Sequence, residues 1–326
     1  MSRKTNAKRP TKGAVPNSKR PASGDGSVTP KVGWFFASNE GGEDKGLNDA
    51  GVVTFKGNIY RYLAREIIQN SLDARESPNK PVIVTFDLKK IRRNDIPTMD
   101  QLASSCQRCR DFWPRNPEKS FFDKAIELCS EDYITALRIS DFNTLGVGGE
   151  DNDRHGERGW YSLIRCSGSS SKEAGEGGSY GIGKNAPFAA SSLRTVLYTT
   201  RTSKKAVAFQ GVARLVTHEK SATVKAQNIG FLGGLKGESI RDADAIPQAF
   251  RRNYRGTDVV ILGFITGKDW EDQLRLSVLD NFWPAIHFGD LEVSIGDLKI
   301  TKENLASLLE ESQNWSFANR WATAIK

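Results

Sequence analysis

Cysteine and histidine are scarce in this sequence, and long apolar runs are missing from it. Its 326 residues include four cysteines and three histidines. Four thiols are too few for a disulfide framework in a chain of this length, so we expect free cysteines in a reducing compartment. No stretch approaches the roughly 20 apolar residues that a membrane-spanning helix needs, and the first residues have no apolar signal-peptide core. These absences predict a cytoplasmic protein without a membrane partner.

The four cysteines leave one alternative open. Cys106 and Cys109 form a CxxC pair, and Cys129 and Cys166 would complete a four-sulfur zinc site if the fold brought them together. Against zinc, the sequence has no second CxxC pair, and the first pair falls within a predicted helix. The three histidines lie in separate segments, and none accompanies a Ser or Cys in a hydrolase motif, so we assign them no chemistry.

Positive charge is concentrated at one end of the chain. Of 47 Lys and Arg and 39 Asp and Glu, residues 1–32 hold eight basic side chains and one acidic side chain, which leaves 39 against 38 elsewhere. This first segment is rich in Pro, Gly, Ser and Asn and poor in large apolar residues, so burial cannot offset its ordering entropy. We expect a disordered tail, which serves either as a solubilising leader or as an arm that binds the phosphates of DNA.

The rest of the chain predicts one sizeable domain and the start of another. Its patterns place a first domain over 33–265, with a helical insert over 94–133 and a long glycine-rich segment over 142–177. Such a long polar segment inside a compact domain is typical of a lid over an active site. Residues 266–326 are expected to begin a second domain.

Local patterns predict the individual elements. Apolar residues at helical spacing predict a helix over 58–76 with Asn58 as its N-cap, whereas 33–57 reads as a connection. Thr301 begins another helix, with Asn304 as its capping-box partner. Prolines near residue 115 divide the insert into two helices. Alternating or β-branched patterns predict strands over 82–88, 136–140, 194–201, 206–216, 258–262 and 291–300.

Three polar residues of the first helix share one face. Glu66, Asn70 and Asp73 lie at i, i+4 and i+7, and the helical period aligns them. Taken alone, such a stripe is a solvated face. The alternative is a site, because a carboxylate and an amide one turn apart can polarise a water and ligate Mg²⁺, as phosphoryl transfer requires.

Four segments in order resemble the motifs of GHKL ATPases, the Bergerat-fold family. Residues 66–74 resemble ExxxNxxDA, and residues 141–146 resemble DxGxG, with Asn143 where that family has glycine. Residues 178–183 match GxxGxG, and residues 255–257 resemble the last motif, which contains Gly-Thr. The family includes gyrase-type topoisomerases, MutL and MORC proteins, sensor histidine kinases and heat-shock chaperones. The resemblance implies an α+β fold of Bergerat type, a two-layer sandwich with helices on one face of a mixed, largely antiparallel sheet, followed by a transducer-like second domain.

The resemblance also implies roles for particular residues in binding Mg·ATP. Glu66 would be the general base for the attacking water and Asn70 the Mg²⁺ ligand, while Asp141 would accept a hydrogen bond from the adenine amino group, with Thr257 assisting through a water. A carboxylate offers acceptors only, so ATP is expected over GTP. Asn143 tolerates left-handed backbone better than most residues, and Gly146 adds flexibility beside it. The glycines would let backbone N–H groups approach the phosphates, and Lys184 is either a further point charge there or a surface lysine at a helix start. The residues expected at the nucleotide are Asn70, Asp73, Asp141, Asn143, Gly146, Gly178, Gly181, Gly183, Lys184 and Thr257.

Several hypotheses are open for the process that ATP would drive. The first is a MutL-like or MORC-like clamp, in which slow hydrolysis, lid closure and homodimer formation act on DNA beside a helicase or nuclease partner, as in phage-defence systems. A chaperone-like ATPase acting on protein clients is the alternative, although its client-binding domain is missing. A sensor kinase fits least, because the sequence shows no phospho-acceptor histidine helix. About sixty residues follow Phe264, so we expect a fragment, a partner that supplies the transducer lysine, or slow hydrolysis.

Overall fold

The computed structural model describes residues 32–48, 50–55, 57–152, 159–166, 183–202 and 206–312. Predictions for the basic tail up to residue 31, and for Gly178 and Gly181, lie outside these residues. Within the described part, no helix combines the length and the apolar character needed to cross a membrane.

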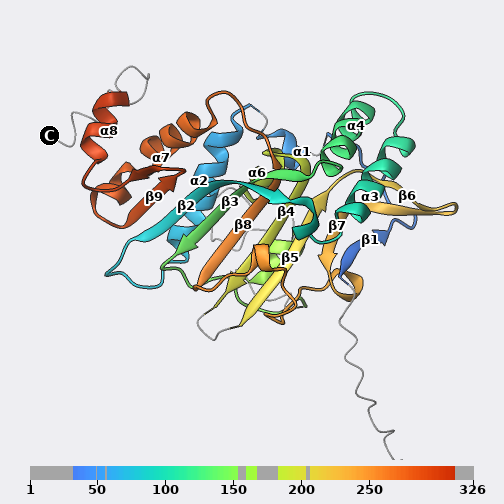
Figure 1. Ribbon diagram of the computed structural model, residues 1–326, viewed down its shortest axis with the longest axis horizontal. Coiled ribbons are helices and arrows are strands. Elements are labelled where there is room, and N and C mark those ends of the chain that lie inside the picture. The colour runs from blue at the N-terminus through green and yellow to red at the C-terminus, as the bar shows by residue number, and fades with distance from the viewer. Residues whose placement is uncertain are drawn as a thin grey trace, which may run out of the picture.

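All the strands in the described part of the chain belong to one sheet (Figure 1). The strands pair in the order β1-β7-β5-β4-β8-β3-β2-β9-β10, and β6 pairs with β7 off this path. Neighbours are antiparallel except β2 and β9, which run parallel. This confirms the predicted α+β class with a mixed, largely antiparallel sheet. The strands are β1 (Gly33–Ser38), β2 (Val82–Arg92), β3 (Tyr133–Phe142), β4 (Ser191–Arg201), β5 (Val207–Arg214), β6 (His218–Ser221), β7 (Val224–Gly233), β8 (Gly256–Phe264), β9 (Leu291–Ile295) and β10 (Leu298–Ile300).

Two helices form the main layer over one face of the sheet. The helix predicted over 58–76 is α2, and its apolar stripe, with Leu63 and Ile68 fully buried, packs in the core formed with Leu137 and Ile139 of β3. Ser277 of α7 donates a hydrogen bond to the carbonyl of Arg61 on α2 at 2.8 Å. The helices are α1 (Ala50–Val53), α2 (Ile59–Asp73), α3 (Met99–Phe112), α4 (Glu118–Cys129), α5 (Trp160–Arg165), α6 (Ala186–Ala189), α7 (Trp270–His287) and α8 (Leu305–Glu311).

The helical insert covers the opposite face, which corrects the expectation of helices on one face alone. The predicted pair of helices is present as α3 and α4, at the right of Figure 1. Leu102 and Phe122 of this pair share a core with Ile134 and Ala136 of β3. Successive strand residues point to opposite faces, so β3 buries apolar side chains on both sides and needs a cover on each.

Two local predictions near the start of the described chain differ from the structure, and one near its end agrees in part. Residues 33–38, read as a connection, form the edge strand β1. Asn58 precedes α2 but makes no side-chain capping bond. At the other end, α8 begins after Asn304, whose side chain accepts a hydrogen bond from the backbone N–H of Thr301 at 2.8 Å. Propensity-based capping rules locate a helix end without deciding which group makes the bond.

The segment expected to begin a second domain continues the first one as far as it is described. β9 extends the sheet by pairing with β2, and Val293 and Ile295 of β9 share a core with Leu305 and Leu308 of α8 and with α2. Residues 266–312 therefore form part of the same sheet and the same core.

Candidate functional site

Helix α2 carries the first three predicted site residues along one flank. The side chain of Glu66 is 14% exposed, and Asn70 lies one turn further on in an exposed position. Asp73, the last residue of the helix, is exposed and accepts a hydrogen bond from Gln69 at 2.9 Å. The apolar stripe of α2 packs on the sheet and so presents Glu66 and Asn70 at the margin of that layer rather than within it.

Glu66 lies directly against Gly183, 117 residues later in the sequence. Gly183 begins a short 3₁₀ turn, residues Gly183–Asn185, that leads into α6. A Cβ atom built on Gly183 would overlap the carboxylate of Glu66. Glycine is therefore needed for this close approach of a backbone to an acidic side chain. The predicted general base and the last glycine of the predicted phosphate loop are neighbours.

Asp141, at the end of β3, is a nearly enclosed carboxylate that is 13% exposed. Its Oδ1 accepts hydrogen bonds from the Thr144 hydroxyl at 2.7 Å and from the backbone N–H of Thr257 at 2.6 Å. The Ser71 hydroxyl on α2 is 3.3 Å from Oδ2. An ionised carboxylate has about four lone-pair positions, so Oδ2 keeps capacity for a further donor.

The electrostatics of Asp141 reflect its enclosure. Burial raises the pKa of its carboxyl above the ordinary value, while the bonds from Thr144 and Thr257 and the cation of Arg252 act in the opposite direction. Desolvation penalises the charged form, and hydrogen bonds to that form favour it. The carboxylate is therefore preorganised as an acceptor at neutral pH and becomes protonated at a higher pH than an exposed aspartate.

The Gly256-Thr257 pair closes the site from β8. Gly256 has a φ of +124°, and a Cβ atom there would lie 2.5 Å from the backbone oxygen of Asp141. Only glycine allows this approach without strain. We expected Thr257 to assist through a water, whereas its own backbone N–H bonds the carboxylate directly.

Asn143 and Gly146 shape the loop after β3. Asn143 has the left-handed φ of +56° that the motif comparison anticipated. Its side-chain amide donates to the carbonyls of Ser77 at 3.0 Å and Lys80 at 2.9 Å, so it ties this loop to the α2–β2 connection. Gly146 has a φ of +68°, and a Cβ atom there would lie 2.5 Å from the Arg201 carbonyl oxygen. Both residues hold the loop in place through contacts within the protein.

Lys184 and α5 link the glycine loop to the predicted lid. The Lys184 ammonium donates to the carbonyl of Ser162 on α5 at 3.1 Å, and burial lowers its pKa. Trp160 is fully buried, with its indole N–H 3.3 Å from Gln210 of β5. Arg165 lies 3.7 Å from the ring centroid of Phe231 on β7. The described part of the segment 142–177 therefore includes a helix anchored on the sheet.

Three residues that support Asp141 were not recognised from the sequence. Ser71 and Thr144 lie inside the motif segments, but their types carry no signal of their own. Arg252 lies outside every motif, and its guanidinium donates to the backbone carbonyl of Asp141 and approaches Oδ1 at 3.8 Å. No spacing rule could have identified an arginine 111 residues away from its partner.

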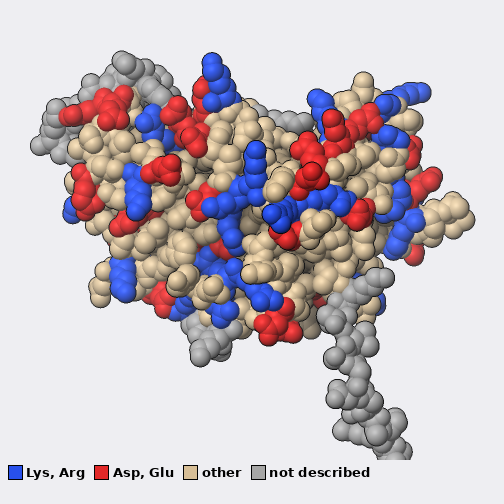
Figure 2. Space-filling view, in the orientation of Figure 1, with Lys and Arg blue, Asp and Glu red and all other residues tan. Residues whose placement is uncertain are grey.

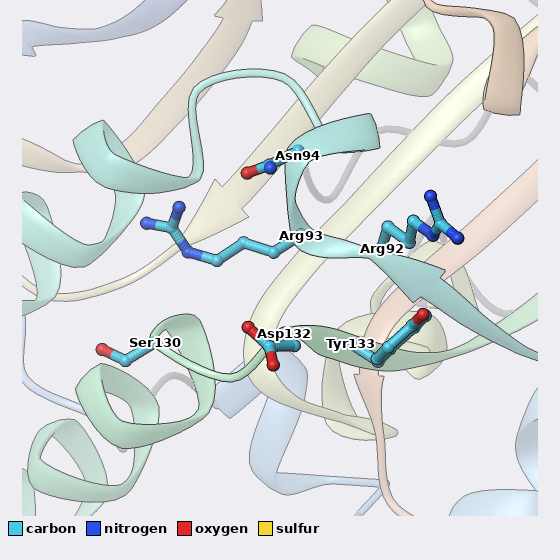
Figure 3. A pocket seen from close by; sticks show the side chains of 6 residues that line it. All are labelled: Arg92, Arg93, Asn94, Ser130, Asp132 and Tyr133. Atoms are coloured by element: carbon cyan, nitrogen blue, oxygen red, sulfur yellow. The ribbon is translucent and has the colours of Figure 1, made fainter.

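Neither the cysteines nor the cavity shown in Figure 3 belongs to this site. Cys106, Cys109 and Cys129 are buried between α3 and α4, and burial raises the pKa of the Cys109 thiol to about 12. Among the described residues, no group of three or more His, Cys, Asp or Glu is placed to hold a metal ion. A cavity of about 480 Å³ lies at the opposite end of β2 and β3 from Asp141, lined by side chains that include Arg92 and Tyr133.

Two polar side chains around Asp141 and Gly183 keep acceptor capacity that a ligand or a water could use. Asp141 keeps acceptor capacity at Oδ2, whereas the space beside the Cα atoms of Gly183 and Gly256 is taken by Glu66 and by Arg252 and Asp141. Asn185, directly after the glycine loop, has a buried Oδ1 without a partner among the described residues. A buried acceptor of this kind is costly unless a donor, such as a hydroxyl or a water, reaches it.

Two solved structures are similar to this chain at low sequence identity. No protein-family model and no curated protein matches this sequence. The chain is similar to the ATPase region of Saccharomyces cerevisiae topoisomerase II bound to ICRF-187 (dexrazoxane), at 10% identity and a TM-score of 0.40 over 78% of this chain and 53% of that one. Another structure of that ATPase region is similar at 11% identity and a TM-score of 0.37, over 77% of this chain and 52% of that one. This chain thus spans about half the length of the topoisomerase chains that it matches.

Proposed function

We propose that this protein binds ATP with Mg²⁺ between α2, the end of β3 and the start of α6, and that it hydrolyses ATP slowly. The supporting observation is the convergence of separate motif segments. Ser71, next to Asn70, and Thr257 both approach Asp141, while Glu66 lies against Gly183. Unrelated polar stripes would have no reason to meet around one enclosed carboxylate and one glycine turn.

Each residue has a distinct task in this proposal. Asp141 accepts a hydrogen bond from the exocyclic amino group of adenine at Oδ2, where guanine would present a carbonyl instead. Glu66 takes the proton of the attacking water, and Asn70 ligates the cation through its amide oxygen. Bound Mg²⁺ would neutralise charge on the phosphate oxygens. Gly183 lets the Glu66 carboxylate lie against the backbone at the turn that leads into α6.

The resemblance to clamp-like family members motivates a broader proposal. ATP would close the lid and promote association of two copies in a DNA-handling assembly, with a helicase or nuclease as a further partner and phage defence as one setting. Its support is the basic segment 1–32, with eight Lys and Arg against one Asp. In the body, Figure 2 shows Lys and Arg interspersed with Asp and Glu over the viewed face, with a group of basic side chains near its centre.

Nucleotide binding and turnover test the assignment separately. Calorimetry with Mg·ATP and Mg·GTP should show a preference for ATP in the parent protein that Asp141→Asn loses, because an amide can turn a donor toward the amino group. Asp132→Asn makes the same change beyond the other end of β3 and should bind like the parent. Glu66→Gln should keep ATP affinity and lose about 10²- to 10⁴-fold in phosphate release. Unchanged ATP binding in Asp141→Asn would refute the adenine assignment.

A further inference from the structure

Resting on the proposed function, we infer that Arg252 is a positioning residue that fixes the Asp141 carboxylate for recognition of the purine amino group. Arg252 lies in the loop before β8, outside every motif that the sequence offers. It would act on the nucleotide only through Asp141. Its role is therefore specificity for the base rather than chemistry at the phosphates.

The guanidinium of Arg252 is fully committed to this part of the structure. Its side chain is 4% exposed, and a guanidinium has five N–H donors. Nη2 donates to the backbone oxygens of Asp141 and, at 3.0 Å, of Arg255. The other donors reach the side chain of Asp258 and the backbone carbonyls of Tyr254 at 2.9 Å and Thr257 at 3.3 Å. All five N–H groups therefore have acceptors, which fixes the group in one orientation.

These contacts join the two segments that shape the carboxylate. Asp141 ends β3, while Thr257, whose N–H bonds its Oδ1, begins β8. Arg252 bonds the backbone of both, and its guanidinium carbon lies 4.9 Å from the ring centroid of Phe142. The antiparallel ladder already pairs Ser140 at the end of β3 with Asp258 at the start of β8. The fork adds side-chain bonds that fix the segment beyond this ladder, at Asp141, and a planar group with five donors has no substitute among single-point cations.

A second arginine provides a matched control. Arg138, in β3, binds the other oxygen of Asp258 at 3.1 Å and is 25% exposed. Asp258 therefore keeps one of its two arginine partners when either Arg252 or Arg138 is replaced. The Asp141 carbonyl takes its bond from Arg252 rather than from Arg138. The two arginines share a buried carboxylate but differ in whether they reach the base-reading residue.

The test compares ATP with purine riboside triphosphate, which lacks the 6-amino group. If Asp141 reads that group, the parent should prefer ATP by roughly 10- to 100-fold, as expected for a hydrogen bond to a charged group. Arg252→Met should reduce this ratio to within about threefold of unity, chiefly by weakening ATP. Arg252→Lys should reduce it as well, because an ammonium cannot span both strands. Arg138→Met should keep the parent's ratio.

The outcomes separate this inference from the function on which it rests. A parent that binds neither nucleotide, or that shows no preference between them, refutes the proposed role of Asp141 and the inference with it. A parent with the preference and an Arg252→Met variant with the same ratio refutes the inference alone, even if both affinities fall, since equal losses mean a structural role. If Arg252→Met does not fold, Arg252→Lys decides in the same way.

Discussion

Replacing Gly183 with alanine should slow hydrolysis while leaving the fold and ATP binding nearly intact. The reason is the position of Glu66, because the new Cβ atom would overlap its carboxylate and its Cδ and Cγ atoms. Gly183 is the first residue of a 3₁₀ turn, a backbone conformation that alanine also adopts. The side chain of Glu66 must then rotate away from the glycine turn, and the general base leaves its place.

The size of the effect follows from what moves. A flexible side-chain end can shift at little cost, and an alanine in place of a glycine gains about 0.4–1 kcal/mol through the unfolded state, so stability should change by less than about 1 kcal/mol. Catalysis is more sensitive, since a displacement of about 1 Å can cost on the order of 10²-fold. Loss of the base altogether costs about 10²- to 10⁴-fold. We expect Gly183→Ala to lose about 10²-fold in turnover.

Single-turnover phosphate release and calorimetry, measured on the same samples, provide the assay. Gly57→Ala is the control, because nothing lies within 4 Å of the Cβ position there. In a Glu66→Ala background, Gly183→Ala should cause no further loss, since residues that act as a unit are not additive. Normal turnover in Gly183→Ala would refute the reasoning, and so would an additional loss in the double variant.

Three further predictions concern pH, stability and charge. Burial raises the pKa of Asp141, and only the ionised carboxylate is a pure acceptor. ATP affinity should therefore fall as the pH drops through this raised pKa, which lies above the ordinary aspartate value of about 3.9. Calorimetry at several pH values should show a smaller dependence on pH for purine riboside triphosphate than for ATP. Leu63→Ala should lower the free energy of unfolding by about 2–5 kcal/mol in a urea titration, since Leu63 is fully buried under α2, and a loss below about 1 kcal/mol would contradict the packing described. If the full chain binds DNA, the logarithm of its affinity should fall with the logarithm of salt concentration with a slope near −4 to −6, from roughly −0.9 per contacted phosphate. Deleting residues 1–32 should make this slope shallower without changing ATP affinity. An unaltered slope would assign DNA binding to the folded body.

The sequence predicted most of the elements and the order of the motifs because these depend on local patterns. Helix α2 and the β4–β5 hairpin follow from periodicity, and the two helices of the insert from a break at proline. The left-handed backbone at Asn143 also follows from residue type, since asparagine adopts it more readily than most residues. Local patterns thus located most of the helices and strands, whereas the candidate site residues came from the resemblance of four segments to known motifs.

Long-range contacts could not be predicted in the same way. Arg252 reaches Asp141 across the start of β8, and the helices α3 and α4 cover a second face that the resemblance did not imply. The residue type of Asn143 indicated its left-handed backbone, but the sequence did not show where its side chain points. Its amide donates to the carbonyls of Ser77 and Lys80. Such contacts depend on which strands are neighbours, and that is set by the whole sheet rather than by a sequence window.

The anchoring of α5 restricts how the predicted lid could work. Moving residues 159–166 away from the sheet would expose Trp160 and break the stacking of Arg165 on Phe231. Exposing a buried tryptophan costs several kcal/mol, comparable to the 3–5 kcal/mol lost when such a residue is truncated. An ATP-dependent movement that includes α5 would therefore need binding energy of that order. Helix α5 is therefore held on the sheet, and Lys184, bonded to the Ser162 carbonyl at 3.1 Å, links it to the glycine turn against which Glu66 lies.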